Sequence, residues 1–217
     1  MALFLKKLIL NLLFPIICVG CRQEIKIEAY LCAACFKKLK FYGGQLNLNL
    51  KFIDEVNIAG DYDDKRLAEL IKILKFKAIP GAAKTLIAWL TLFWQGQASL
   101  KSKYLLVIPI PLSRRRLRAR GFNQSEIIAR GLALNFGYDL NLELIKIKET
   151  KPQSNLNAAK RIGNLIEAFK WTGQIPINQD ILLIDDVITT GTTMEEAAKV
   201  LKTAGARKII ALVAAKG

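Results

Sequence analysis

The sequence predicts an α/β fold with a central, mostly parallel sheet flanked by helices, preceded by a small cysteine-rich module. Residues 105–108 (LLVI) and 181–184 (ILLI) are continuous apolar runs, which is typical of strands buried on both faces of a parallel sheet. The second run is followed by a polar loop, an amphipathic segment and a third apolar stretch at residues 208–214, as in a βαβ unit. With 217 residues, 52% of them hydrophobic, the chain can form one sizeable domain and a small module.

The N-terminal segment, MALFLKKLILNLLFPII, has an amphipathic pattern. Its apolar residues recur at helical spacing, with lysines and an asparagine opposite, so we expect a helix. The apolar residues are Phe4, Leu5, Leu8, Ile9, Leu12 and Leu13. The stretch resembles a signal peptide, but Pro15 interrupts it and it is too short to span a membrane. We therefore expect no transmembrane segment, a cytoplasmic protein, and a helix that docks on the protein or on a partner. Peripheral association with the inner face of the membrane is the alternative.

The chain has four cysteines, spaced C-x₂-C-x₁₀-C-x₂-C. They are Cys18, Cys21, Cys32 and Cys35. Two chelating pairs joined by a short connection are typical of a structural Zn²⁺ site, in which four thiolates leave no open position on the metal. Zinc would supply folding free energy that so small a segment cannot obtain from its own core. Two disulfides are the alternative, which the expected cytoplasmic setting disfavours.

A domain boundary is expected at Tyr42-Gly43-Gly44, so that residues 1–44 form the N-terminal module and residues 45–217 the larger domain. Residues 46–60 should supply a strand. Two helices should follow, over residues 63–76 and about residues 82–93. In the first helix, apolar residues at helical spacing should face the core, namely Leu67, Leu70, Ile71 and Leu74. Its basic residues are expected on the solvent side, namely Lys65, Arg66, Lys72, Lys75 and Lys77.

A strongly basic stretch follows the strand at residues 105–108, which ends at Pro109 and Pro111. It contains Arg114, Arg115, Arg116, Arg118 and Arg120. Guanidinium groups bind phosphate oxygens in a bidentate manner, so this stretch suits anionic ligands. We expect the first arginine to bind a pyrophosphate and the four beyond it to bind nucleic acid. A solvated basic turn is the alternative.

Residues 181–193 (ILLIDDVITTGTT) combine two acids, four threonines and a glycine. Ligands of open parallel sheets bind at the carboxyl ends of the strands, so Asp185 and Asp186 should stand at the mouth of a crevice. Their carboxylates can accept hydrogen bonds from a ribose diol, and the threonines around Gly191 can donate to a phosphate. The segment lacks the lysine of a Walker loop, and no G-x-G-x-x-G fingerprint is present. An ordinary strand–loop–helix with a polar turn is the alternative.

A helix should follow this loop. Thr193 and Glu196 have the spacing of a capping box, which predicts the beginning of the helix, and Gly205 after Lys202 predicts its end.

The segment 181–193 resembles the phosphoribosyl pyrophosphate (PRPP) motif of type I phosphoribosyltransferases. The resemblance implies that fold, with a hood to which residues 46–60 contribute, and a site for PRPP with Mg²⁺. The acids would contact the ribose hydroxyls, the threonine loop would bind the 5′-phosphate, and the loop after the upstream strand would hold the pyrophosphate. The implied binding residues are Leu112, Ser113, Arg114, Asp185, Asp186, Val187, Ile188, Thr189, Thr190, Gly191, Thr192 and Thr193. Arg114, Asp185 and Asp186 would act in catalysis, and residues 115–124 would form a flexible loop closing over the reaction centre.

Three segments together, PIPLSRRRLRARGFNQSE, PQSNLNAAKRIGNLIEAF and the PRPP motif, resemble the ComF family of competence proteins. A spacing pattern of that family is matched by Gln153, Leu156, Arg161, Asn164 and Phe169. The resemblance implies an N-terminal zinc ribbon and a role in natural transformation, beside the helicase or channel of DNA uptake. Taken alone, the segment around Leu165 and Phe169 suits a helix with both side chains packed inward.

The formal net charge is +15, and residues 101–130 contain eight basic residues and one acid. A single anionic ligand does not require this excess, which favours a polyanion such as single-stranded DNA. Scattered solvent-facing lysines are the alternative. The sequence shows no interleaving of aromatic and basic residues of the kind that stacks single strands.

Three functions remain open on this basis. The protein could bind PRPP and single-stranded DNA in competence, with Arg115, Arg116, Arg118 and Arg120 contacting the nucleic acid. It could instead be an active phosphoribosyltransferase of nucleobase salvage, or a PRPP-sensing regulator without turnover. No residue pattern indicates a particular acceptor base or an oligomeric state.

Overall fold

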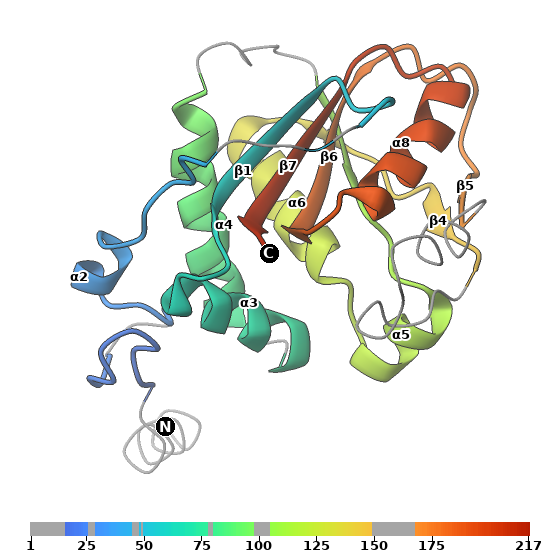
Figure 1. Ribbon diagram of the computed structural model, residues 1–217. Helices are drawn as coiled ribbons and strands as arrows, with labels where there is room; N and C mark the ends of the chain where they lie inside the picture. Colours follow the sequence, from blue (N-terminus) through green and yellow to red (C-terminus); the bar gives the residue numbers. More distant parts are fainter. Residues whose placement is uncertain are drawn as a thin grey trace.

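The computed structural model describes residues 16–25, 29–44, 48, 50–77, 80–97, 105–148 and 168–217. These contain a five-stranded sheet of order β1-β7-β6-β2-β3 in which every neighbouring pair is parallel (Figure 1). Its strands are β1 (Glu55–Asp61), β2 (Leu105–Pro109), β3 (Asp139–Leu140), β6 (Asp180–Ile188) and β7 (Ile209–Lys216). An antiparallel ribbon of β4 (Leu144–Lys146) and β5 (Phe169–Trp171) lies against α8 (Thr192–Thr203). The predicted mostly parallel sheet is confirmed.

Helices cover both faces of this sheet. Successive side chains of a strand point to opposite faces, so the continuous apolar run of β6 serves two cores. Leu182 and Ile184 pack with α3 (Lys65–Lys77), α4 (Pro80–Gln95) and α6 (Gln124–Phe136). Leu183 faces the other way and packs with residues of α8. Burial on both faces explains why residues 181–184 of this strand are all apolar.

Most of the predicted elements are present with small shifts of their ends. The helices expected over residues 63–76 and 82–93 are α3 and α4, and the expected βαβ unit is β6, α8 and β7. The strand expected within residues 46–60 is β1. Gly205 follows α8 with a φ of +95°, as expected for a glycine that ends a helix.

The expectation of a flexible loop over residues 115–124 is wrong for its first part, which forms helix α5 (Arg114–Arg120). Ser113 caps this helix, since its Oγ accepts a hydrogen bond from the backbone N–H of Arg116 at 3.4 Å. Arginine is a strong helix former, and basic residues in the last turn interact favourably with the helix dipole. Gly121, with a φ of +82°, then ends the helix.

The predicted capping box is also wrong. Gly191, with a φ of +76°, occupies the cap position of α8, and no side chain caps the helix. The hydroxyls of Thr190 and Thr192 lie 2.8 Å apart and pair with each other. The loop therefore turns on a left-handed glycine, a conformation that side chains disfavour.

The cysteine-rich module packs on the helix pair α3 and α4. Cys18 and Cys35 share a buried cluster with Leu70 and Ala82, and Cys35 lies within a short helix, α2 (Ala33–Phe36). The backbone N–H of Tyr30 donates to Thr85 Oγ1 of α4 at 3.1 Å. The module is thus attached to the larger domain by packing and hydrogen bonding as well as by the covalent backbone.

Two expectations fall on residues that are not described. The N-terminal amphipathic helix and the pattern residues Gln153, Leu156, Arg161 and Asn164 lie outside the described ranges. Phe169 is buried as expected, but it lies in strand β5 and not on a helix. No helix in the described ranges is both long and apolar enough to cross a membrane.

Candidate functional site

A cavity of about 640 Å³ opens at the carboxyl ends of β2 and β6. Its walls contain several of the residues singled out from the sequence, namely Leu112, Ser113, Arg116, Arg120 and all of 185–193. Arg114, Arg115 and Arg118 do not line it; they are exposed on α5. The two segments that the sequence places far apart, after β2 and after β6, therefore face one space.

The two acids of β6 point to different partners. Asp186 is 4% exposed, and its Oδ2 lies 2.9 Å from Nζ of Lys75 on α3, in an ion pair without hydrogen-bond geometry. Asp185 is partly exposed, and its Oδ1 accepts hydrogen bonds from Ser125 Oγ at 2.8 Å and from the backbone N–H of Asp186 at 2.9 Å. Burial raises the pKa of Asp185 to about 7, and the charge of Asp186 acts in the same direction. The pair is thus poised to receive a ligand that brings positive charge or hydroxyl donors.

Lys75 is a site residue that the sequence analysis missed, because it was placed on the solvent side of its helix. It follows Ile71 by four residues and Leu67 by eight, and both of these are fully buried. Residues four apart share a helix face, so the spacing itself could have placed Lys75 on the inward side. A lysine at such a position indicates a buried acid opposite.

Ser125 and Asn123 were also missed, and both are buried. Asn123 Nδ2 donates to the carbonyl oxygen of Ile110 at 3.0 Å, and its side chain also accepts from the N–H of Ser125. Because Ser125 donates to Asp185, this short segment connects the loop after β2 to the acids of β6. Side chains of these types usually lie at surfaces, so no pattern in the sequence marks them.

The threonine loop lies between β6 and α8. Two features of the loop favour glycine at position 191. The positive φ of Gly191 disfavours other residues, and a Cβ there would lie only 2.9 Å from Cδ2 of Leu50. The N–H groups of the first turn of a helix are unpaired within the helix and attract anions. With the hydroxyls of Thr189, Thr190 and Thr192 beside it, the loop can cradle a phosphate.

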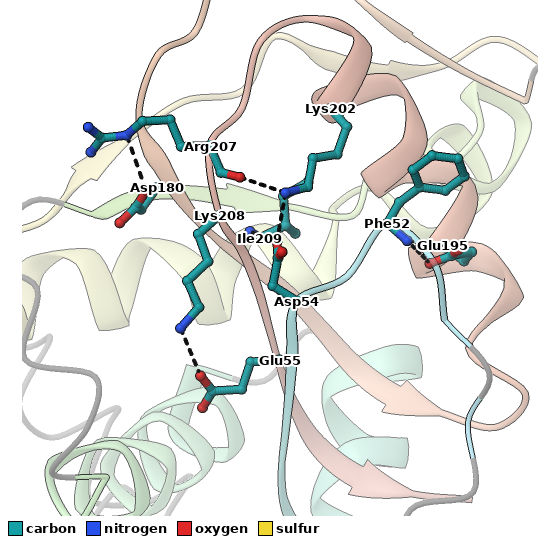
Figure 2. A network of polar contacts seen from close by, with 9 residues as sticks. All are labelled: Phe52, Asp54, Glu55, Asp180, Glu195, Lys202, Arg207, Lys208 and Ile209. Atoms are coloured by element: carbon teal, nitrogen blue, oxygen red, sulfur yellow. Dashed lines mark hydrogen bonds and ion pairs between the residues drawn. The ribbon is translucent and has the colours of Figure 1, made fainter.

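A polar network holds the segment before β1 against α8 (Figure 2). The carboxylate of Glu195 accepts hydrogen bonds from the N–H groups of Lys51 and Phe52, at 2.6 and 3.0 Å. Near the other end of α8, Lys202 Nζ lies 2.7 Å from Asp54 Oδ2. Both contacts fix α8, and with it the loop that precedes it, relative to β1.

The same network reaches β7. Asp54 also accepts from the N–H of Ile209 at 2.7 Å, while Lys202 donates to the carbonyl of Arg207 (Figure 2). Burial acts to raise the pKa of Asp54, but the hydrogen bonds from Lys202 and Ile209 outweigh it and lower that pKa. Asp54 is therefore held as a carboxylate by its partners.

Helix α5 forms a basic wall beside the cavity. None of its residues is buried, so its charge faces solvent. Arg120, at its end, donates to Gln124 Oε1, and its guanidinium lies over the ring of Phe76 at 5.6 Å from the centroid. Burial lowers the pKa of Arg120, an effect that the charge of Asp186 opposes.

The four cysteines form a second site. Their Sγ atoms all lie within 4.8 Å of one another, and those of Cys21 and Cys32 are 3.8 Å apart. Four thiolates at a Zn–S distance of about 2.3 Å form a tetrahedron with edges of about 3.8 Å, so the cluster fits this metal. Gly20 leaves room for it, because a Cβ there would lie 2.8 Å from the sulfur of Cys35.

Backbone amides support the thiolates. The N–H of Cys32 donates to the sulfur of Cys18 at 3.3 Å, and that of Cys35 to the sulfur of Cys32 at 3.4 Å. Burial acts to raise the pKa of Cys18, but backbone donors outweigh it and lower that pKa to about 6. Burial and the bond to Cys32 raise the pKa of Cys35 to about 12. With four cysteines and no histidine in the chain, the module can form one such site.

Known proteins resemble the chain, one of them over most of its length and others over about half of it. Competence protein F of Haemophilus influenzae is 31% identical over 202 residues, which cover 89% of this chain and 87% of the relative. The chain belongs to the ComF family of competence proteins. Competence protein ComFC of Streptococcus pneumoniae is 38% identical over 109 residues, or 50% of this chain and 47% of the relative. DNA utilization protein YhgH of Escherichia coli K12 is 32% identical over 105 residues, or 48% of this chain and 45% of the relative.

Domain families match both parts of this ComF-family chain. Residues 118–217 match the phosphoribosyl transferase domain, and residues 9–46 match the double zinc ribbon domain. The predicted phosphoribosyltransferase-like fold with an N-terminal zinc ribbon is confirmed, and the cysteine cluster supports a structural zinc. Among solved structures, a hypoxanthine phosphoribosyltransferase from Staphylococcus aureus aligns over 68% of this chain and 62% of its own, at 17% identity. Its TM-score of 0.35 is too low to support an inference.

Proposed function

We propose that the cavity binds PRPP with Mg²⁺, and that the protein handles single-stranded DNA during or after its uptake in natural transformation. One observation carries the first part: a single cavity is lined by the acid pair, the threonine loop and the guanidinium groups of Arg116 and Arg120. An activated sugar phosphate has the complementary groups, since it offers hydroxyls to carboxylates, a phosphate to the loop and a pyrophosphate to the basic wall.

Each residue then has a role in binding. Asp185 and Asp186 accept hydrogen bonds from the ribose hydroxyls, and residues 187–193 bind the 5′-phosphate. Leu112 and Ser113 hold the pyrophosphate, with Arg116 and Arg120 beside them in place of the expected Arg114, and Mg²⁺ neutralises part of its charge. Lys75 pairs with Asp186 at 2.9 Å and so holds this buried carboxylate in place before the ligand binds.

The role in transformation is supported by the names of the relatives, which are competence proteins and a DNA utilization protein. Four arginines of α5 supply the phosphate contacts, namely the exposed Arg115, Arg116 and Arg118 and the partly buried Arg120. The net charge of +15 favours such a polyanionic partner. We place the protein in the cytoplasm, beside the helicase or channel of the uptake machinery, with residues 1–44 as the zinc module and 45–217 as the PRPP-binding domain.

Turnover is the second candidate, and the position of Arg116 and Arg120 favours it. Two guanidinium groups in the wall of the cavity would stabilise the negative charge that develops on a departing pyrophosphate. Incubation with Mg²⁺, PRPP and a panel of nucleobases, with pyrophosphate release as the readout, separates transfer from binding alone. Pyrophosphate release that requires an added base supports transfer of the ribosyl group to that base, release without any base shows only hydrolysis of PRPP, and an unchanged PRPP pool supports a binding protein.

Binding itself is tested by thermal unfolding. PRPP with Mg²⁺ at about 100 times its Kd should add about 2.7 kcal/mol of stability, or about 5–10 °C in Tm for a domain of this size. Asp185→Ala together with Asp186→Ala should abolish the rise. The control is Asp139→Ala, an exposed carboxylate at the start of β3, which should keep it. A rise that survives the double substitution refutes the assignment of the site.

A further inference from the structure

Phe76 is a large aromatic side chain that remains exposed at the edge of the cavity. It lies in the last turn of α3, is 75% exposed, and belongs to the cavity wall. The guanidinium of Arg120 lies over its ring, 5.6 Å from the centroid. The two residues come from helices far apart in the sequence, α3 and α5, which lie at the same end of the molecule (Figure 1).

A single exposed apolar side chain needs no explanation by itself. Leu134 on α6, for example, is 84% exposed but lies outside the cavity wall. Phe76 differs in its position and in its partner. Its neighbour Lys75 is anchored to Asp186, and Arg120 is anchored to Gln124, so both halves of the pair are held in place.

An exposed ring capped on one side by a guanidinium, beside a basic helix, suits one kind of ligand. Single-stranded nucleic acids bind proteins through bases stacked on aromatic rings and through backbone phosphates held by cationic groups. Free phosphates or sugars would use α5 but would gain nothing from the ring. The ring therefore indicates a planar base.

We infer that one base of a single strand stacks on the ring of Phe76 at the mouth of the cavity, while the neighbouring phosphates lie along the arginines of α5. This inference rests on the proposed function, and it adds a stacking residue to a surface that was otherwise electrostatic. The strand would pass the opening of the proposed PRPP site without entering it.

The test is the affinity of the full-length, zinc-loaded protein for a fluorescent oligothymidylate of about 12 nucleotides, a length that matches known single-strand sites. Stacking of one base contributes about 1–3 kcal/mol, so Phe76→Ala should weaken binding about 5- to 100-fold. Phe76→Trp should restore the affinity, and Leu134→Ala should leave it unchanged. An abasic strand of equal length keeps the phosphates but lacks the bases, so wild type and Phe76→Ala should bind it equally.

Salt dependence separates the two components. Phe76→Ala should leave the slope of log affinity against log salt unchanged, whereas Arg115→Gln and Arg118→Gln together should reduce it. If wild type binds the oligothymidylate and Phe76→Ala binds it equally well, the stacking is refuted while the proposed DNA handling stands. If wild type has no affinity for the strand, the proposed DNA handling itself fails. If Phe76→Ala loses binding of free nucleobases but keeps its affinity for the strand, the inference is also overturned, since the ring would then serve a small ligand.

Discussion

Asp185→Asn should make the ligand-free protein more stable relative to wild type as the pH rises. The difference in free energy of unfolding between variant and wild type should be larger at alkaline pH than at acidic pH. The pKa of Asp185 is raised from 3.8 to about 7 by burial and by the charge of Asp186. The folded protein therefore holds a proton that the unfolded chain releases. The stability that this proton provides is complete below the unfolded pKa and is lost as the pH rises through about 7.

The magnitude follows from the two pKa values. Between about pH 5.5 and about pH 8.5, the linkage relation gives a loss of about 2 kcal/mol for the wild type. Because Asp185 is partly exposed, solvent screening reduces the expected loss to about 1–2 kcal/mol. Asparagine cannot ionise, so the variant should not undergo this loss.

Urea unfolding of zinc-saturated protein, followed by tryptophan fluorescence, measures the difference. The free energy of unfolding of Asp185→Asn minus that of wild type should be larger at the higher pH by this amount. Asp139→Asn, at an exposed position, is the matched control and should show the same difference at both values. An Asp185→Asn difference that does not depend on pH would refute the role of burial and of the neighbouring charge.

Three further substitutions test other parts of the structure. Gly191→Ala places a side chain at a φ of +76° and should cost about 1–2 kcal/mol of stability and weaken the PRPP response; Gly137→Ala, at a φ of +67° away from the cavity, should cost as much and leave that response intact. Lys75→Met leaves Asp186 buried without its ion pair and should cost about 1–3 kcal/mol in denaturant unfolding. Lys72→Met is the control for this substitution, because Lys72 pairs with Glu69 at an exposed position. It should change the free energy of unfolding by about 0.5 kcal/mol or less. Elemental analysis should find one zinc per chain in the wild type and less in Cys21→Ser, whereas stoichiometric disulfides would contradict the zinc site.

Local sequence was sufficient wherever the physics is local. An apolar run such as 181–184 can be stable only as a strand covered on both faces, which predicts the parallel sheet and its helices. Cysteines spaced as in this module can chelate a tetrahedral ion without help from the rest of the chain. The acids and the threonine loop also lie within one short segment, so their joint presence at a strand end could be read directly.

Local sequence was not sufficient where two structural preferences of the same short segment compete. The resemblance to phosphoribosyltransferases implied a flexible loop over residues 115–124, but arginine's helix propensity and the Ser113 cap produce α5 instead. At the start of α8, a glycine in the left-handed region replaced the expected threonine cap. In both cases the sequence offered two local conformations, and the residue types alone did not show which of the two is more stable.

The sequence by itself determined the sheet, the zinc module and the acid–threonine segment, since each depends on residues that are close together in the chain. Only the tertiary structure decided that Lys75 pairs with Asp186, that Ser125 holds Asp185, and that Phe76 meets Arg120. Such pairs depend on how α3, α5 and α6 pack around the carboxyl ends of the strands. No periodicity within one segment encodes the partner that packing brings to it from another.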